Sequence, residues 1–201
     1  MKPSKMMSHS GCHGRIDADS LAQAWMAATN TVPTLAERKQ FRLWLIDQFT
    51  KMRAERIEPL FVTREVSIDE AMSSLSKVTL PGETRRLPIS RLNNEPNPDL
   101  MSTQQNLAFR AVHDWIHHKI KADATFEGEL SVTLAHIESA PPEIHWILWS
   151  EVACQAAVTI STGSFPQQKL AKLILMPDPI HHHRRHRPGF LDRAPVFLFT
   201  Q

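Results

Sequence analysis

Residues 102–121, STQQNLAFRAVHDWIHHKIK, have the most regular apolar periodicity in the chain. Apolar side chains recur there at spacings of three and four, which is typical of one face of an amphipathic helix. They are Leu107, Ala108, Ala111, Val112, Trp115, Ile116 and Ile120. The segment also contains His113, Asp114, His117 and His118. We therefore predict a helix that combines a core-facing side with a cluster of ionisable side chains.

The histidines of this helix have the spacing that a shared metal ion requires. On an ideal helix His113 and His117 lie about 40° apart, whereas His113 and His118 lie about 140° apart. A one-residue π-bulge, which tends to mark functional sites, would bring His113 and His118 into line. Asp114 is expected to orient a ligand or to pair with Arg110. The alternative is an ordinary amphipathic helix whose polar side is rich in histidine.

A second segment, residues 144–160, is almost entirely apolar or small, which predicts a buried helix. Glu151 is the only charged residue between Glu143 and Lys169. A buried carboxylate is destabilising unless a cation, a metal ion or strong hydrogen-bond donors accompany it. We expect Glu151 either to pair with Arg110 or to bind a metal ion together with the histidines.

Two histidines on one helix and a carboxylate on another are the ingredients of a 2-His-1-carboxylate site. The expected ligands are His113, Glu151 and either His118 or His117. This donor set holds Fe(II) and leaves positions open for oxygen and substrate. Zinc accepts the same donors together with a water molecule. The predicted cofactor is a divalent metal ion, with Fe(II) favoured and zinc as the alternative.

Residues 112–118, VHDWIHH, resemble the His-Glu-Leu-Leu-Gly-His motif of the aromatic amino acid hydroxylases, with His113 and His118 at the two iron-ligand positions. Residues 149–152, WSEV, resemble the segment around the carboxylate ligand of that family. The resemblance implies a non-haem iron enzyme, oxygenase-like or hydroxylase-like, that oxidises a small-molecule substrate. It does not extend to a pterin-binding segment.

The same region is similar to a group of uncharacterised phage and bacterial proteins with a His-Asp-x-x-Gly-His segment, then Gly-Glu, a histidine and Glu-x-x-x-Gln. The matching residues here are Gly128, Glu129, His136, Glu151 and Gln155. Glu129 and His136 are seven residues apart and therefore share one helix face. We expect them to form a second metal site, or to line the substrate pocket and move protons. A surface pair on a short helix is the alternative.

The whole sequence predicts a mainly α protein with a single helical domain, a long proline-rich loop and little sheet. The loop covers residues 80–98, and helices are expected throughout residues 102 to about 176. The elements expected before the loop are a helix beginning near Asp19, a helix over residues 34–55 with a capping box, an extended segment at 60–66 and a short helix at 67–75.

Residues 19–176 are expected to form this domain, with the metal site in residues 102–162. Residues 1–18 contain little that could be buried and are interpreted as a mobile N-terminal segment. Residues 177–201 are interpreted as a His/Arg-rich C-terminal segment.

Length, charge and cysteine content exclude several classes of protein. A chain of 201 residues can bury a core without disulfides, and it has only two cysteines. The net charge of +2 is too small to indicate nucleic-acid binding by itself. No apolar stretch reaches the roughly 18 residues that a membrane span requires. We expect a cytoplasmic protein without membrane contact, and the sequence leaves its oligomeric state open.

Two other functions are consistent with the sequence. His113-Asp114 is also the metal-binding dipeptide of the HD phosphohydrolases, but the only earlier histidines, His9 and His13, lie in the expected mobile segment. The other is a non-enzymatic helical accessory protein, phage-associated, that contacts an anionic partner such as nucleic acid. It would use basic helix faces and residues 181–187, HHHRRHR, and would contain no stoichiometric metal.

Overall fold

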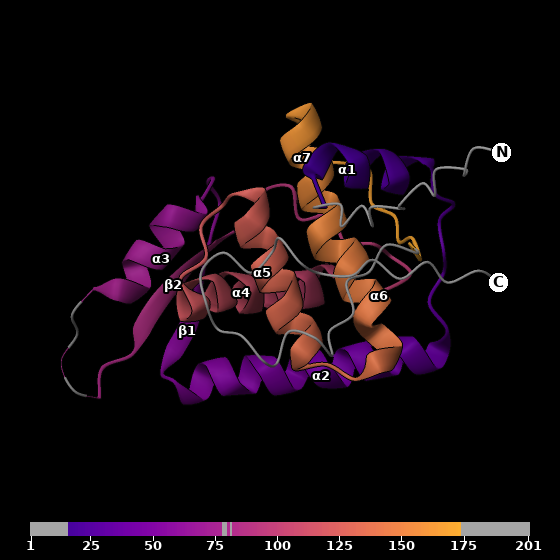
Figure 1. Cartoon of the computed structure of the whole chain (residues 1–201). Helices are drawn as coiled ribbons and strands as arrows, with labels where there is room; N and C mark the ends of the chain where they lie inside the picture. Colours follow the sequence, from indigo (N-terminus) through magenta and orange to yellow (C-terminus); the bar gives the residue numbers. More distant parts are fainter. Residues whose placement is uncertain (1–15, 78–79, 81, 174–201) are drawn as a thin grey trace, which may run out of the picture.

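The computed structural model of the chain describes residues 16–77, 80 and 82–173, which form the mainly α domain that the sequence predicts (Figure 1). Its elements are α1 (Ala18–Ala27), α2 (Leu35–Ala54), β1 (Ile57–Val62), α3 (Ile68–Ser76), β2 (Arg85–Ser90), α4 (Thr103–Ile120), α5 (Phe126–Glu138), a 3-10 turn (Pro142–Ile144), α6 (His145–Leu148), a π-helical turn (Trp149–Cys154) and α7 (Gln155–Thr162). The segment 177–201 and nearly all of 1–18 lie outside the described residues. None of the described helices is long and apolar enough to cross a bilayer.

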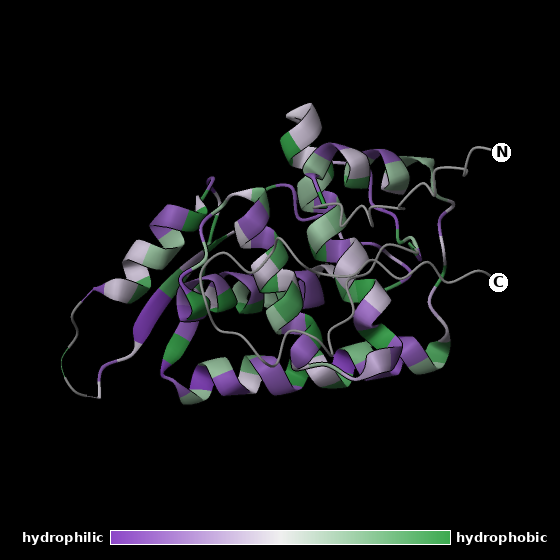
Figure 2. Ribbon diagram, viewed as in Figure 1, coloured by the Kyte–Doolittle hydropathy of each residue, from purple (hydrophilic) through white to green (hydrophobic). Residues whose placement is uncertain are grey.

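Helix α2 runs along the lower edge of the molecule in Figure 1. The predicted capping box fixes its start, because the Thr34 hydroxyl accepts from the Glu37 backbone N–H and the Glu37 carboxylate accepts from the Thr34 backbone N–H. Hydrophilic and hydrophobic residues are interspersed along the helix (Figure 2), and Phe41 and Trp44 are among those that are buried. Helix α2 packs against α4, the helix that carries the histidines.

Strands β1 and β2 form a two-stranded parallel sheet, and α3 lies in the crossover between them. Ile57 pairs with Arg85 at the start of the register. Strand β1 begins three residues before the predicted extended segment at 60–66 and overlaps it only over residues 60–62. Strand β2 lies inside the segment predicted as a loop, although it contains Pro88. Both strands are edge strands, where a residue without an N–H is tolerated.

Three helical segments surround the candidate site. Helix α4 begins after Ser102, which forms a second capping box with Gln105, and ends at Lys121 in the left-handed conformation. Helix α5 packs against α4 and against the π-helical turn. Helix α6, the π-helical turn and α7 follow one another as the buried helical run that the sequence predicts, beside α5 in Figure 1.

This run ends at Thr162, close to the end of the predicted buried segment 144–160, whereas helices were expected to continue to about residue 176. Gly163 takes a left-handed φ of 69°, a common way to end a helix, and Pro166 follows. The chain then returns along α1, where the Lys169 ammonium donates to the carbonyl oxygens of Met26 and Ala28.

Contacts between distant parts of the sequence fix the π-helical turn in the core. Trp25 of α1 is buried, and its indole N–H donates to the Ser150 hydroxyl at 2.9 Å. The same hydroxyl accepts from the backbone N–H of Ala171 at 3.0 Å. Ser150 therefore joins α1, the π-helical turn and the C-terminal described segment. The next residue, Glu151, lines a pocket on the α4 and α5 side.

Candidate metal centre

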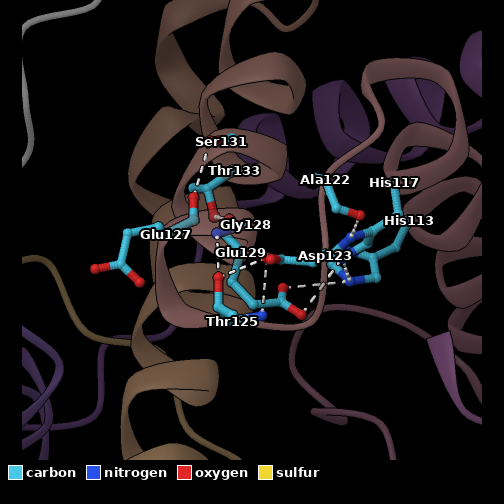
Figure 3. A network of polar contacts seen from close by, with 10 residues as sticks. All are labelled: His113, His117, Ala122, Asp123, Thr125, Glu127, Gly128, Glu129, Ser131 and Thr133. Carbon is cyan, nitrogen blue, oxygen red and sulfur yellow. Dashed lines mark hydrogen bonds and ion pairs between the residues drawn. The ribbon is translucent and has the colours of Figure 1, made fainter. Parts of the chain in front are cut away.

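Two histidines of α4 and one glutamate of α5 bring their donor atoms together (Figure 3). Nε2 of His113 lies 3.1 Å from Nε2 of His117. Oε2 of Glu129 lies 3.4 Å from His113 Nε2, and Oε1 of Glu129 lies 3.3 Å from His117 Nε2. Among the residues that the structure describes, these three converge as a group of potential metal ligands. We call this group the His/His/Glu cluster.

The separations within the cluster match those between ligands of one metal ion. Nitrogen and oxygen donors lie about 2.0 to 2.2 Å from zinc, so neighbouring donors are about 3.0 Å apart at an octahedral angle and about 3.4 Å apart at a tetrahedral angle. The observed separations of 3.1, 3.3 and 3.4 Å lie in this range. The cluster could therefore hold a divalent metal ion with little rearrangement.

The regular geometry of α4 positions both imidazoles. Residues four apart lie on the same side of an α-helix, which places His117 one turn beyond His113. The His117 side chain is fully buried, and its Nδ1–H donates to the carbonyl oxygen of Ala122 at 3.2 Å. This hydrogen bond fixes the ring and directs Nε2 toward the cluster, as expected for a metal-ligating histidine. Nδ1 of His113 has no hydrogen-bond partner among the described residues.

A tight turn between α4 and α5 positions Glu129. Thr125 caps α5 by accepting from the Gly128 N–H, and Thr125 in turn donates through its N–H and hydroxyl to the Asp123 carboxylate. A Cβ atom on residue 128 would overlap the carbonyl oxygen of Asp123, so only glycine fits there. The turn places Glu129 in the first turn of α5, where it extends toward the imidazoles while Glu127 points away from them (Figure 3).

Burial and mutual attraction act in opposite directions on the ionisation of the cluster. Burial alone would raise the pKa of Glu129, but His113 and the hydrogen bond with His117 lower it below its usual value. Burial lowers the pKa of His113 to about 4, although Glu129 opposes this shift. Burial also acts to lower the pKa of His117, but its contacts with Glu129 outweigh burial and raise it. The site thus favours an ionised carboxylate next to a positive charge.

His118 lies outside the cluster. Helix α4 is α-helical along its whole length, so His118 is rotated by about 100° from His117. Burial and the charge of Arg85 lower the pKa of His118. The expected placement of His118 beside His113 is corrected accordingly, because it requires a π-bulge in α4. The structure has its π-helical turn at Trp149–Cys154 instead.

Glu151 is buried as predicted, but it is not a member of the cluster. Its side chain is 8% exposed, and its Oε1 atom has no hydrogen-bond partner among the described residues. Burial raises the pKa of Glu151 to about 8, against a hydrogen bond from Gln155. Arg110, the expected alternative partner, instead donates to the carbonyl oxygen of Leu92. The third donor beside the histidines is therefore Glu129, which we expected in a second site or as a proton-transfer residue.

His136 lies beside the cluster and is fully buried. Its ring stacks on the ring of His113 with centroids 5.8 Å apart, and it stacks on Phe109 at the same centroid distance. Neither ring nitrogen has a hydrogen-bond partner among the described residues, and burial lowers the pKa of His136 well below its usual value. His136 is therefore a neutral ring that supports His113. As predicted from their spacing of seven residues, His136 and Glu129 lie on the same face of α5, the face toward α4.

A pocket of about 440 Å³ adjoins the cluster. His113 and Glu129 line it, together with Asp114 and Arg110 of α4 and Glu151 of the π-helical turn. Burial raises the pKa of Asp114 to about 7. The volume lies in the range of small-molecule sites. An ion held by the cluster would therefore be next to a cavity that can admit a small molecule.

We compared the chain with models of protein families, with curated proteins and with solved structures, and found no match in any of the three. The function is therefore inferred from the geometry of the site.

Proposed function

We propose that the protein is a metal-dependent enzyme whose ion is Fe(II), held by His113, His117 and Glu129. The distances between the two Nε2 atoms, and from each Nε2 atom to one of the two Glu129 carboxylate oxygens, support this proposal, because they match those between neighbouring ligand atoms on one ion. Two imidazoles and one carboxylate form the donor set of non-haem iron centres, which leave positions open for dioxygen and substrate. The proposed reaction class is the oxidation of a small molecule that binds in the adjoining pocket.

The surroundings of each ligand support the same proposal. The hydrogen bond from His117 to Ala122 holds one ring, and stacking on His136 holds the other. The packing of Gly128 against Asp123 sets the start of α5 and therefore the position of Glu129. Metal-ligating side chains are commonly oriented by such contacts. His113 and Glu129 also line the pocket, so a molecule bound there would lie next to the ion.

Metal content tests the proposal directly. The full chain would be purified without an affinity tag, with His181, His182, His183 and His186 replaced by serine so that this segment does not bind metal. After anaerobic reconstitution with Fe(II), we expect about one equivalent of iron per chain, and less than about a tenth in His117→Ala or Glu129→Gln. The matched controls are His118→Ala on the same helix and Glu127→Gln on the outer side of α5. Equal iron content in all five proteins would contradict the proposed ligands.

Metal-assisted hydrolysis is the second candidate, and one observation favours it. Asp114 directly follows the first histidine and lines the same pocket as His113. A zinc ion on two imidazoles and a carboxylate lowers the pKa of its water to about 7. A neighbouring carboxylate can accept a proton from such a water. Reconstitution with equimolar Fe(II) and Zn(II), followed by elemental analysis and assays under air and under nitrogen, separates oxygen-dependent turnover from hydrolysis.

A further inference from the structure

The pocket beside the cluster is lined by more acidic than basic residues. Its acidic lining residues are Glu65, Glu95, Asp114, Glu129 and Glu151. Arg110 is the single lysine or arginine among the lining residues, and its guanidinium also donates to the carbonyl oxygen of Leu92. Above the raised pKa values of Asp114 and Glu151, the formal charge of this lining stays negative even with a divalent ion bound beside Glu129. Such a lining attracts cations and repels anions.

Glu151 provides an independent indication that a ligand binds there. Glu151 is 8% exposed, and its Oε1 atom has no hydrogen-bond partner among the described residues. Buried polar atoms are normally paired, and an unpaired carboxylate oxygen is among the most destabilising exceptions. Arg110 and the His/His/Glu cluster do not supply the partner. Glu151 does line the pocket, so a donor group bound there would lie next to its side chain.

The rest of the lining defines the other part of the ligand. Apolar side chains of β2, α4 and the helical run 145–162 share the wall with Glu151. They include Ile89, Phe109, Val152, Ala156 and Ile160. A hydrocarbon chain packed against this wall would be removed from water, which favours binding by about 25 cal/mol for each Å² of apolar surface buried. A ligand with one cationic end and a short apolar body satisfies both parts of the lining.

We propose that this pocket binds an organic cation of the alkylammonium or alkylguanidinium class, with the charged end donating hydrogen bonds to Glu151 and the alkyl part against the apolar wall. This inference rests on the proposed function and names the substrate class of the metal centre. An ammonium or guanidinium would supply a donor to Oε1 of Glu151, and charge-assisted hydrogen bonds are the stronger kind. The charged end would lie at Glu151, and the same pocket is lined by His113 and Glu129 of the cluster.

Binding of four small probes tests the proposal. The probes are n-butylammonium, n-butylguanidinium, n-butanol and butyrate, titrated into the full chain and followed by amide chemical shifts in NMR spectra. We expect both cations to bind at least about tenfold more tightly than the alcohol, and butyrate to bind least. Glu151→Gln should weaken the binding of the cations by about tenfold or more and leave that of butanol unchanged. Glu143→Gln, outside the pocket, should change neither.

Two further measurements separate this inference from the proposed function. The titrations are repeated on the metal-free protein and on Glu129→Gln, where cation binding should persist even if the cluster binds no iron. Iron content is measured in Glu151→Gln, where it should equal that of the wild type. Equal affinity of the wild type for butanol and the cations would overturn the proposal. Unchanged cation affinity in a folded Glu151→Gln variant would also overturn it. If that variant does not fold, the relative affinities of the wild type for the four probes still test the proposal.

Discussion

The Nε2 atoms of His113 and His117 face each other at 3.1 Å, while the Nδ1–H of His117 donates to the carbonyl oxygen of Ala122. With its proton held on Nδ1, a neutral His117 has only a lone pair at Nε2. That lone pair faces a second imidazole nitrogen and, at 3.3 Å, a carboxylate oxygen of Glu129. A proton or a metal ion must occupy this space for the contact to be favourable, and the two compete for it.

Metal binding should therefore strengthen with rising pH. Burial acts to lower the pKa of His117, but Glu129 raises it above its usual value, so the metal must displace a proton below that pKa. Below the pKa of His117, the dissociation constant for zinc should fall by about tenfold per pH unit. Calorimetric titrations from pH 5.5 to 8 check this, with His118→Ala as the control that keeps the same pH dependence. A dissociation constant that does not change with pH would show that no cluster histidine binds the ion.

Gly128→Ala should damage both the fold and the metal site. The new Cβ would overlap the carbonyl oxygen of Asp123, so the turn before α5 must move and carry Glu129 with it. We expect a loss of about 1 to 3 kcal/mol in the free energy of unfolding and at least about tenfold weaker metal binding. Urea denaturation and metal titration measure the two effects.

Gly163→Ala is the matched control for this prediction. Gly163 has a left-handed φ of 69° but open space around its Cβ position. Alanine there should cost about 1 kcal/mol through its backbone conformation alone. Its metal affinity should equal that of the wild type, and a parallel loss in both variants would indicate a general effect of lower stability.

Glu151 should make the metal-free protein less stable as the pH rises. Burial raises its pKa from 4.5 to about 8, so the folded state binds more protons than the unfolded chain between these values. The free energy of unfolding should therefore fall from pH 4.5 to pH 8. Glu151→Gln, which stays neutral, should match the wild type near pH 5 and exceed it at pH 8 by up to about 4 kcal/mol. Urea denaturation along this pH series, with Glu143→Gln as control, tests the difference.

Glu37 should have the opposite pH dependence. Burial acts to raise its pKa, but hydrogen bonds from Thr34, the Trp146 indole and Lys172 lower it to about 2. Its contribution to stability is complete above pH 4.5 and is lost as the pH falls through 2. Glu37→Ala should lose about 1 to 3 kcal/mol at pH 7, because it removes the capping box and the contact between α2 and α6. The difference from the wild type should shrink in acid denaturation followed by circular dichroism.

The parts of the fold that depend on neighbouring residues could be predicted from the sequence. The spacing of apolar residues predicts α4, and the capping box at Thr34 together with the apolar spacing predicts α2, because those interactions lie within one or two helical turns. Strand β2 could not be predicted, since Pro88 is tolerated only where its backbone nitrogen needs no partner. That condition depends on β1, which is about 30 residues earlier in the chain.

The candidate site could likewise be predicted only where it depends on residues close together in the sequence. The i, i+4 spacing of His113 and His117 is a property of one helix, and the structure preserves it. The carboxylate of the cluster could not be predicted in the same way. The single charge of Glu151 in an apolar segment indicates that it is buried, but not which other helix its side chain faces. Glu129 meets the imidazoles because the turn at residues 121–125 is short and Gly128 packs tightly in it. The Gly-Glu pair directly after that turn was the available signal.

The π-helical turn at Trp149–Cys154 contains one residue more than ordinary α-helical winding would place there. If the same residues wound as a regular α-helix instead, α7 would be rotated by about 100° about its own axis. Gln155, Ala156 and Thr159 would then swing out of the lining that they now share with His113. The phase of α7 relative to α4, and with it the shape of the cavity, depends on the π-helical winding of Trp149–Cys154.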